Sequence, residues 1–368
     1  MAEYYYDRAD RAPKRRSPLM LIVDIVVLLL SVLFFVAMTL ALVTSYYDPS
    51  ISWIFPVLGL FTPAVYVGTT LCALYWIIRA RWFYAVILLL PLLVGLPSIS
   101  RYLNIEVSKS YGEPSRRGTV RVLSYNVKGF IGDDQQSSQH GMQEFLNEQR
   151  PDVICFQEFA KSRMSESDEP DAIKNFNRAK IKELAIYSRY KILGSSDDLV
   201  NSDYDSGSAF WADLLIGGDT VRVYNVHLHS TAITTLDDSY ITNMEFINDT
   251  LSDDMFRGML SRFRTTSIGR AAQADTIAHS IAQTPHRVVV CGDFNDTPNS
   301  YAYRKISEGL QDSFQEAGVG YSYTFRGFKN LLRIDYILAQ EPTQVLSYQV
   351  IDSVLLSDHL PVVTTLKF

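Results

Sequence analysis

Apolar residues form three long runs before residue 103 and many short runs after it. Residues 19–43 hold one charged side chain, Asp24, and no proline or glycine, so a helix here could cross roughly 30 Å of hydrocarbon. Apolar runs follow at 54–78 and 83–99, and the last is shorter and holds two prolines. The pattern predicts an integral membrane protein with about three transmembrane helices, of which the third is the weakest.

A secretory signal peptide is the alternative interpretation of the first run, because a basic segment at 8–16 precedes it. The apolar core of a signal peptide is only about 7 to 15 residues long and ends at a small-residue cleavage site. Residues 19–43 exceed that length, and no such site follows them before the next run. This comparison favours an uncleaved anchor.

Basic residues set the expected orientation in the membrane. Arg79 and Arg81 lie between the second and third runs, the N-terminal flank holds five basic residues, and residues 46–52 hold none. Since basic residues stay on the cytoplasmic side, we expect a cytoplasmic N-terminus. Three spans then carry the chain after Arg101 to the extracytoplasmic side, as suits a bacterial inner membrane, whereas two spans would leave it inside.

The expected organisation is a basic tail at 1–17, a membrane domain at 18–103, a polar linker at 104–118 and a folded domain at 119–368. Residues 104–368 hold 26 lysines and arginines against 35 aspartates and glutamates, a formal charge of −9. Tight, nonspecific binding of nucleic acid normally needs a basic surface. The composition of the folded domain does not indicate one.

Short β-rich runs alternate with polar, helix-like stretches in the folded domain. The β-rich runs are TVRVLSYNV, DVICFQE, SAFWADLLI, TVRVYNVHL, HRVVVCGDFN, RIDYILAQ, LSYQVIDSV and PVVTTLKF. Helices are expected at 139–149, 171–185, 268–283 and 300–308, and Gly217-Gly218 predicts a hairpin. The pattern predicts an α/β (α+β) fold, with two β-sheets packed face to face and covered by helices.

Two features stand outside this alternation. Residues 231–264 mix Met, Phe and Leu with acids, which predicts either an amphipathic helix packed on the domain or a lid or membrane-surface element that shapes substrate choice. Cys72 lies in an apolar run, and Cys155 and Cys291 lie in β-rich runs, where cysteine often acts as a small buried hydrophobe. The cysteines therefore imply no disulfide framework.

Polar side chains recur where β-rich runs begin or end, and we call this set of strand ends the rim. The rim residues are Asn126, Glu158, His227, His229, Asp293, Asn295, Asp335, Asp358 and His359. Burying such groups without partners costs free energy, so their repetition at six strand ends suggests a shared site.

The rim composition suits hydrolysis of a phosphoester. A hard divalent cation, Mg²⁺ or alternatively Mn²⁺, prefers carboxylate and amide oxygens, which Glu158 and Asn126 can supply. Asp293 can position water and accept its proton, and Asn295 faces the same side two residues on. Each residue also has a structural interpretation, such as a turn or a helix start.

The same reaction could also use His359, at the start of the last β-rich run. His359 can stabilise phosphoryl charge or transfer protons if a carboxylate orients it, and Asp335 is the candidate. No covalent nucleophile is needed for this reaction.

The pieces LSYNV, FQE, NVHL, GDFN, RIDYIL and SDHLPV resemble, in order, the endonuclease/exonuclease/phosphatase superfamily, the fold of pancreatic deoxyribonuclease. They cover the chain from about Arg121 to its end. The resemblance implies a four-layer α/β sandwich of two mixed sheets flanked by helices, and a catalytic domain at 119–368.

The resemblance also implies a role for each rim residue. Glu158 is expected to be the principal metal ligand, with Asn126 beside it and Asp358 supporting the metal or the histidine. Asp293 is expected to activate water, and Asn295 to donate a hydrogen bond in the transition state. The phosphate contacts are expected from His359, which Asp335 orients, and from His227 or, as the alternative, His229.

Members of this superfamily hydrolyse different phosphoesters, so the motifs imply the reaction and leave the substrate open. The membrane anchor and the acidic domain favour a metal-dependent phosphodiesterase or phosphatase acting on phospholipid or sphingolipid head groups, nucleotides or other extracellular phosphoesters. The alternatives are a membrane-tethered nuclease acting on nucleic acid and a non-catalytic binding module. No obligate protein partner is inferred.

Overall fold

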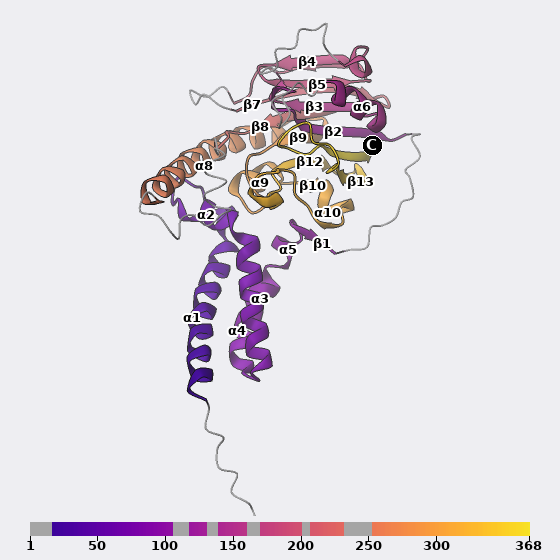
Figure 1. The fold of residues 1–368 in the computed structure, drawn as a ribbon. Helices are drawn as coiled ribbons and strands as arrows, with labels where there is room; N and C mark the ends of the chain where they lie inside the picture. The colour runs from indigo at the N-terminus through magenta and orange to yellow at the C-terminus, as the bar shows by residue number, and fades with distance from the viewer. Residues whose placement is uncertain (1–16, 106–117, 131–138, 160–169, 201–206, 232–251) are drawn as a thin grey trace, which may run out of the picture.

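A computed structural model describes residues 17–105, 118–130, 139–159, 170–200, 207–231 and 252–368. Helices α1, α3 and α4 lie side by side beneath a β-sheet domain (Figure 1). The N-terminal helical elements are α1 (Pro18–Ala41), a 3₁₀ turn (Thr44–Tyr46), α2 (Ile54–Leu60), α3 (Thr62–Ile78), α4 (Trp82–Val94) and α5 (Leu96–Ile99).

Among the described helices, α1 alone is long and apolar enough to cross a membrane by itself, and most of its apolar side chains are exposed. Helices α2 and α3, bent by 70° at their junction, pass the same test if they are counted as one span. Helix α4 has 13 residues, about 20 Å of helix, which is short of a bilayer core. The prediction of three spans stays a prediction.

The single charge in the first apolar run has a partner on the neighbouring helix. Asp24 on α1 accepts two hydrogen bonds from Arg79, at 2.9 and 3.0 Å, and one from the Tyr75 hydroxyl at 2.6 Å. About two turns further along α1, Trp76 Nε1 donates to Ser31 Oγ at 2.8 Å. These bonds fix α1 against α3, since polar groups in an apolar setting are stable only when paired.

Two six-stranded mixed sheets form the rest of the fold. The first has the order β13-β14-β2-β3-β5-β4 and the second β10-β12-β9-β8-β7-β6. The strands are β2 (Val120–Asn126), β3 (Val153–Gln157), β4 (Asn177–Ile181), β5 (Leu184–Ser188), β6 (Ile192–Ser195), β7 (Ser208–Ile216), β8 (Asp219–His227), β9 (Arg287–Asp293), β10 (Leu310–Asp312), β12 (Asp335–Gln340), β13 (Gln344–Val350) and β14 (Val362–Lys367). A separate short pair joins β1 (Leu103–Asn104) to β11 (Gly320–Tyr321).

Helices cover both outer faces, so the domain has four layers, as the sequence predicted. The central core between the sheets includes Val122, Val223 and Ile337. Helix α6 (Gln139–Gln149) covers the first sheet; the second sheet is covered by α8 (Ser252–Gln283) and α9 (Tyr301–Ile306), while α10 (Ser313–Ala317) packs near β13.

One buried polar bridge links the two sheets just behind the rim. Asn225 on β8 donates from Nδ2 to the backbone oxygens of Phe156 (2.9 Å) and Ala185 (3.0 Å). Its Oδ1 accepts from Gln157 Nε2 at 2.7 Å. Because Gln157 precedes Glu158 and Asn225 lies two residues before His227, this bridge sets how the two sheets present their rim residues.

The prediction of a helix at 171–185 was wrong. A short 3₁₀ helix (Asp171–Ile173) is followed by the hairpin of β4 and β5, whose turn includes Lys182 at φ 47°. The apolar residues of β5 are fully buried in the sheet, and this tertiary pairing overrides the helix propensity of the lysines and alanines.

The other secondary-structure predictions fared better. The helix at 139–149 is present as α6, and the hairpin at Gly217-Gly218 is confirmed, with φ 64° and 99° as a type I′ turn requires. The helix predicted at 268–283 is the second half of the longer α8. Of the segment 231–264, the part from residue 252 is helical, as the amphipathic interpretation expected, and residues 232–251 lie outside the described residues.

Candidate active site

Strand register brings the rim residues of both sheets together. Asp293 on β9 pairs with Asp335 on β12 and with His227 on β8. Across the two sheets, Asn126 Nδ2 donates to Asp293 Oδ2 at 3.0 Å and lies 3.3 Å from Glu158 Oε1. Asp293, on the second sheet, therefore contacts rim residues of both sheets.

The centre of the site consists of Asp293, Asp335 and His359, which we call the central cluster. One ligand atom from each lies within 4.8 Å of the others, and all three side chains are buried. His359 Nδ1 is 3.0 Å from Asp335 Oδ2, and its Nε2 is 3.6 Å from Asp293 Oδ2. Asp335 thus holds one imidazole nitrogen and turns the other toward Asp293.

Charge in the central cluster is set by burial and by mutual attraction. Burial raises the pKa of Asp335 to about 6, against the opposite pull of His359. Burial alone would lower the pKa of His359, but the Asp335 and Asp293 carboxylates outweigh it and raise it to about 10. At neutral pH the pair is therefore ionic, with a carboxylate at Asp335 and a cationic imidazole at His359.

Surrounding contacts fix the geometry of this pair. Thr324 Oγ1 accepts hydrogen bonds from the backbone N–H of Ile334 (2.9 Å) and of Asp335 (3.0 Å), which locks the start of β12. The Phe325 ring packs on the His359 imidazole with 5.0 Å between ring centres. Neither Thr324 nor Phe325 stood out in the sequence.

His227 is the second buried histidine of the site. Its Nδ1 is 3.0 Å from Glu183 Oε1, while its Nε2 is 3.8 Å from both Glu158 Oε1 and Asp293 Oδ2. These last distances are too long for hydrogen bonds, so the buried Nε2 has no hydrogen-bond partner within the described part of the chain. Burial lowers the pKa of His227, but the nearby carboxylates, led by Glu183, outweigh burial and raise it.

The residues expected to hold the metal lie on the first sheet, beside Asp293. Glu158 follows β3 in a left-handed conformation (φ 53°), with its backbone oxygen accepting from Gly129 N at 3.1 Å. Strained backbone of this kind clusters at functional sites, where the surroundings hold it in place. Asn126 also accepts at Oδ1 from Lys128 N, which fixes its amide.

Asn295 has its side-chain amide turned to the second sheet. Its backbone N–H donates to Asp293 Oδ1 at 2.8 Å, and its Nδ2 donates to the backbone oxygen of Leu228 at 2.9 Å. The residue has φ 50°. In this conformation Asn295 fixes the turn that orients Asp293.

The structure separates the remaining rim residues from the centre. Asp358 lies at the edge of the site, where its partly exposed carboxylate pairs with Lys128 Nζ at 2.7 Å. The His229 ring lies against Gly269 of α8, and its backbone N–H donates to Gln273 Oε1 at 2.8 Å. His227, rather than His229, is the histidine that faces Asp293.

The donor set suits a hard divalent cation. Carboxylate oxygens of Glu158 and Asp293 converge on Asn126 Nδ2, which donates to both, and on His227 Nε2, which has no hydrogen-bond partner among the described residues. The amide oxygen of Asn126 accepts from Lys128 N, so the two carboxylates are the oxygen donors that face this space. Carboxylate and amide oxygens are ligands of Mg²⁺ and Mn²⁺. The residues present therefore fit such an ion.

Sequence reasoning missed Glu183 and Lys128. Glu183 lies in the turn between β4 and β5, in a stretch predicted to be helical, so no strand end marked it. Recognising that hairpin would have placed Glu183 at the same end of the sheet as Glu158, whose neighbour Phe159 donates its N–H to the Glu183 backbone oxygen at 2.8 Å.

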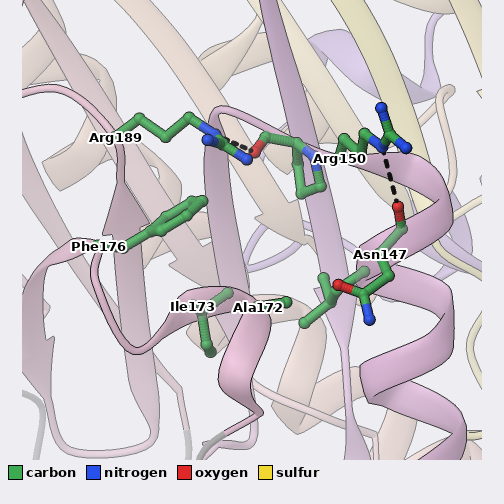
Figure 2. Close-up of a pocket in the computed structure, with 8 residues that line it drawn as sticks. Asn147, Arg150, Ala172, Ile173, Phe176 and Arg189 are labelled. Atoms are coloured by element: carbon green, nitrogen blue, oxygen red, sulfur yellow. Dashed lines mark hydrogen bonds between the residues drawn. The ribbon is translucent and has the colours of Figure 1, made fainter.

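A pocket of about 340 Å³ lies elsewhere on the domain (Figure 2). It is lined by residues around the end of α6 and the start of β3, the opposite end of that strand from Glu158. Arg189 lines one side of it, stacking on Phe176 at 5.0 Å and donating to the Pro151 backbone oxygen. The lining has no carboxylate or histidine, so this pocket is not the catalytic site.

Comparison with known sequences identifies the class of protein. The sequence model of the endonuclease/exonuclease/phosphatase family matches residues 123–359, and a domain of unknown function matches residues 24–102. The chain belongs to the endonuclease/exonuclease/phosphatase family. No curated protein sequence matches it.

Solved structures with a similar fold come from several organisms. A humanized zebrafish (D. rerio) TDP2 is 17% identical with a TM-score of 0.48, covering 68% of this chain and 100% of its own. An endonuclease/exonuclease/phosphatase from Bacteroides vulgatus is 18% identical (TM-score 0.48; 68% and 99%). A mannosyl-6-phosphatase from Bacteroides thetaiotaomicron is 19% identical (TM-score 0.45; 68% and 100%). None of these similarities assigns a substrate to this chain.

Proposed function

We propose that the protein is a membrane-anchored, divalent-metal-dependent hydrolase of phosphoester bonds. The observation that carries this proposal is the buried cluster of Asp293, Asp335 and His359, with Glu158 and His227 beside it. Burying several carboxylates and imidazoles close together lowers the stability of the fold. Such clusters of ionisable groups are typical of active sites, where they serve the reaction.

Glu158 and Asn126 would hold the metal, as the resemblance implies, and Asp293 lies close enough to contribute an oxygen. When bound, the ion would polarise the phosphoryl oxygen and offset developing negative charge. Asp293 would accept the proton of an attacking water, whose oxygen forms the new bond to phosphorus as the bond to the leaving oxygen breaks. The cationic His359 imidazole would supply the proton that turns the leaving oxygen into an alcohol. Asn295 would keep the Asp293 carboxylate in the orientation that this proton transfer needs.

The two histidines would act on the phosphoryl group. His359, held by Asp335 at 3.0 Å, and His227, held by Glu183 at 3.0 Å, present two imidazoles around Asp293, and nearby carboxylates raise the pKa of both. Preoriented cations at a buried site stabilise phosphoryl charge without reorganisation during the reaction. Asp358, which pairs with Lys128, would support this arrangement from the edge of the site.

The position of the site favours a substrate at the membrane surface. Asn299 bonds directly to the ends of α1 and α3, and Asn295 is four residues away, which is at most about 15 Å of chain. If residues 18–103 form the membrane domain and the catalytic domain is extracytoplasmic, the active site then lies near the outer face of the bilayer. A phospholipid or sphingolipid head group is the substrate class that this placement favours.

Hydrolysis by the full-length protein in lipid nanodiscs tests this proposal. The substrates are phospholipids, sphingomyelin, phosphatidylinositol phosphates, nucleotides, RNA and plasmid DNA, each with Mg²⁺ and with EDTA. We expect metal-dependent release of phosphate or head group from a lipid, and loss of turnover in His359→Ala. Turnover of nucleic acid alone would make the protein a membrane-tethered nuclease, and no turnover by folded protein would favour a binding module.

A further inference from the structure

The loop after Asn295 joins the β-sheet domain to the membrane helices. We call residues 296–300 the docking loop. Within it, Asn299 is 2% exposed. Asn299 Nδ2 shares its two N–H groups among Ala41 O (2.8 Å), Thr44 Oγ1 (3.0 Å) and Thr62 Oγ1 (3.0 Å), and Asn299 Oδ1 accepts from Ser98 Oγ (2.8 Å).

Neighbouring residues of the docking loop make contacts of the same kind. Thr297 Oγ1 donates to the Gly59 backbone oxygen at 3.3 Å, and Arg101 donates to the Pro298 backbone oxygen at 3.2 Å. A Cβ atom on Gly59 would lie only 3.2 Å from the Asn299 backbone oxygen, so glycine permits this close approach. Three consecutive loop residues are thus bonded to the membrane helices and the segment that follows them.

The other end of the docking loop is tied to the catalytic residues. Asp296 accepts from the fully buried Arg270 at 3.0 Å, and the same guanidinium donates to the His229 backbone oxygen at 3.0 Å. Asn295, which directly precedes Asp296, donates its backbone N–H to Asp293 Oδ1. The backbone from Asp293 to Asn299 is therefore held at both ends, by the active site and by the helix ends.

We infer that Asn299 is a positioning residue of the active site, through which the ends of the membrane helices hold the backbone that carries Asp293. This inference rests on the proposed function, because its catalytic consequence presupposes hydrolysis. A buried amide whose donors and acceptor are all used leaves several groups unsatisfied when it is removed. The loop would then settle elsewhere, and small displacements of a catalytic group lower turnover steeply.

Asn299→Ala in the full-length protein in nanodiscs tests this inference. We expect kcat to fall about 10- to 100-fold with KM within about twofold, since the substrate contacts remain while Asp293 is misplaced. From the helix side, Thr62→Val removes one acceptor and should lower kcat in the same direction. Thr62→Ser keeps the hydroxyl and should restore it.

Asn104→Ala is the matched control. Asn104 is also a buried amide just after the membrane helices, but it donates to the backbone oxygens of Phe314 (3.3 Å) and Gln315 (3.0 Å), away from the docking loop. It should lower the unfolding temperature as Asn299→Ala does and leave kcat within about twofold. Equal falls in kcat for Asn104→Ala and Asn299→Ala, or an unchanged kcat in Asn299→Ala, would overturn the inference.

Amide hydrogen exchange measures the same coupling without any substrate. Peptides covering residues 293–300 should exchange faster in Asn299→Ala than in wild type and should be unchanged in Asn104→Ala. If the protein hydrolyses no phosphoester, this result still supports the mechanical link while the proposed function fails. If hydrolysis is observed but exchange in 293–300 is the same in all three proteins, the positioning role is wrong and the proposed function stands.

Discussion

Asp335→Asn removes one charge from the centre of the site and almost no volume. Asp335 is 1% exposed at its side chain, and both of its carboxylate oxygens lie within 3.2 Å of His359 Nδ1. The amide can still offer one oxygen to Nδ1, but it no longer stabilises a cationic ring. We therefore expect kcat to fall about 10²- to 10⁴-fold, the range for a positioned proton-transfer group.

The same substitution should lower stability. Removing one member of a buried ion pair typically costs about 3–5 kcal/mol, because the other charge is left without a partner. His359 Nε2 keeps Asp293 at 3.6 Å, so we expect the lower end, about 3 kcal/mol. Thermal unfolding of the full-length protein measures this loss. The control is Asp352→Asn, at an exposed position between β13 and β14.

The pH dependence has a definite sign. The pKa of His359 is raised to about 10 in the folded protein, above the ordinary 6.5, so the cationic imidazole contributes its stabilisation fully at pH 6.5 and loses it as the pH rises through 10. The pKa of Asp335 is raised to about 6, so this carboxylate takes up a proton below that pH and the ion pair is lost on the acid side as well. The stability difference between wild type and Asp335→Asn should therefore shrink toward pH 10. The alkaline limb of kcat should move to lower pH in the variant. A kcat within about threefold of wild type, with an unmoved alkaline limb, would refute the orienting role of Asp335.

Three further outcomes are expected. Arg270→Met should lower the free energy of unfolding by about 3–5 kcal/mol, because it leaves the buried Asp296 carboxylate without its charged partner. Arg287→Met, which removes one member of an exposed ion pair, should lower it by less than about 1 kcal/mol. Glu183→Gln should lower kcat about 10- to 100-fold by releasing His227, measured with Asp352→Asn as control. Alkaline phosphatase fused after Phe368 should be active and a cytosolic reporter silent; the reverse would mean an even number of spans.

The fold and most of the site could be predicted because the strand ends carry a clear signal. Apolar β-rich runs that stop at Asn126, Glu158 or Asp293 place carboxylates and amides at the mouths of buried strands, and parallel and antiparallel neighbours in register then bring them together. The pairing of Asp335 with His359 followed from the same reasoning and is present at 3.0 Å.

What could not be predicted depends on contacts between distant segments. Glu183 was missed because the charged, lysine-containing sequence around it is typical of a helix. The burial of β5 in the sheet, which makes this stretch a hairpin, cannot be read from the local sequence. Asn299 directly precedes the helix predicted at 300–308 and was not singled out, because its contacts lie 201 to 258 residues away in the chain. Local patterns carry no information about such docking.

The most direct test of the central claim is metal-dependent turnover at the buried cluster. Full-length protein would be assayed for phosphoester hydrolysis in EDTA, after Mg²⁺ is restored, and in folded Glu158→Gln and His359→Ala variants. We expect no turnover in EDTA, recovery with Mg²⁺, and a fall of at least about 10²-fold in both variants. Turnover that persists in EDTA, or that survives in either variant, would contradict the proposed metal-dependent site.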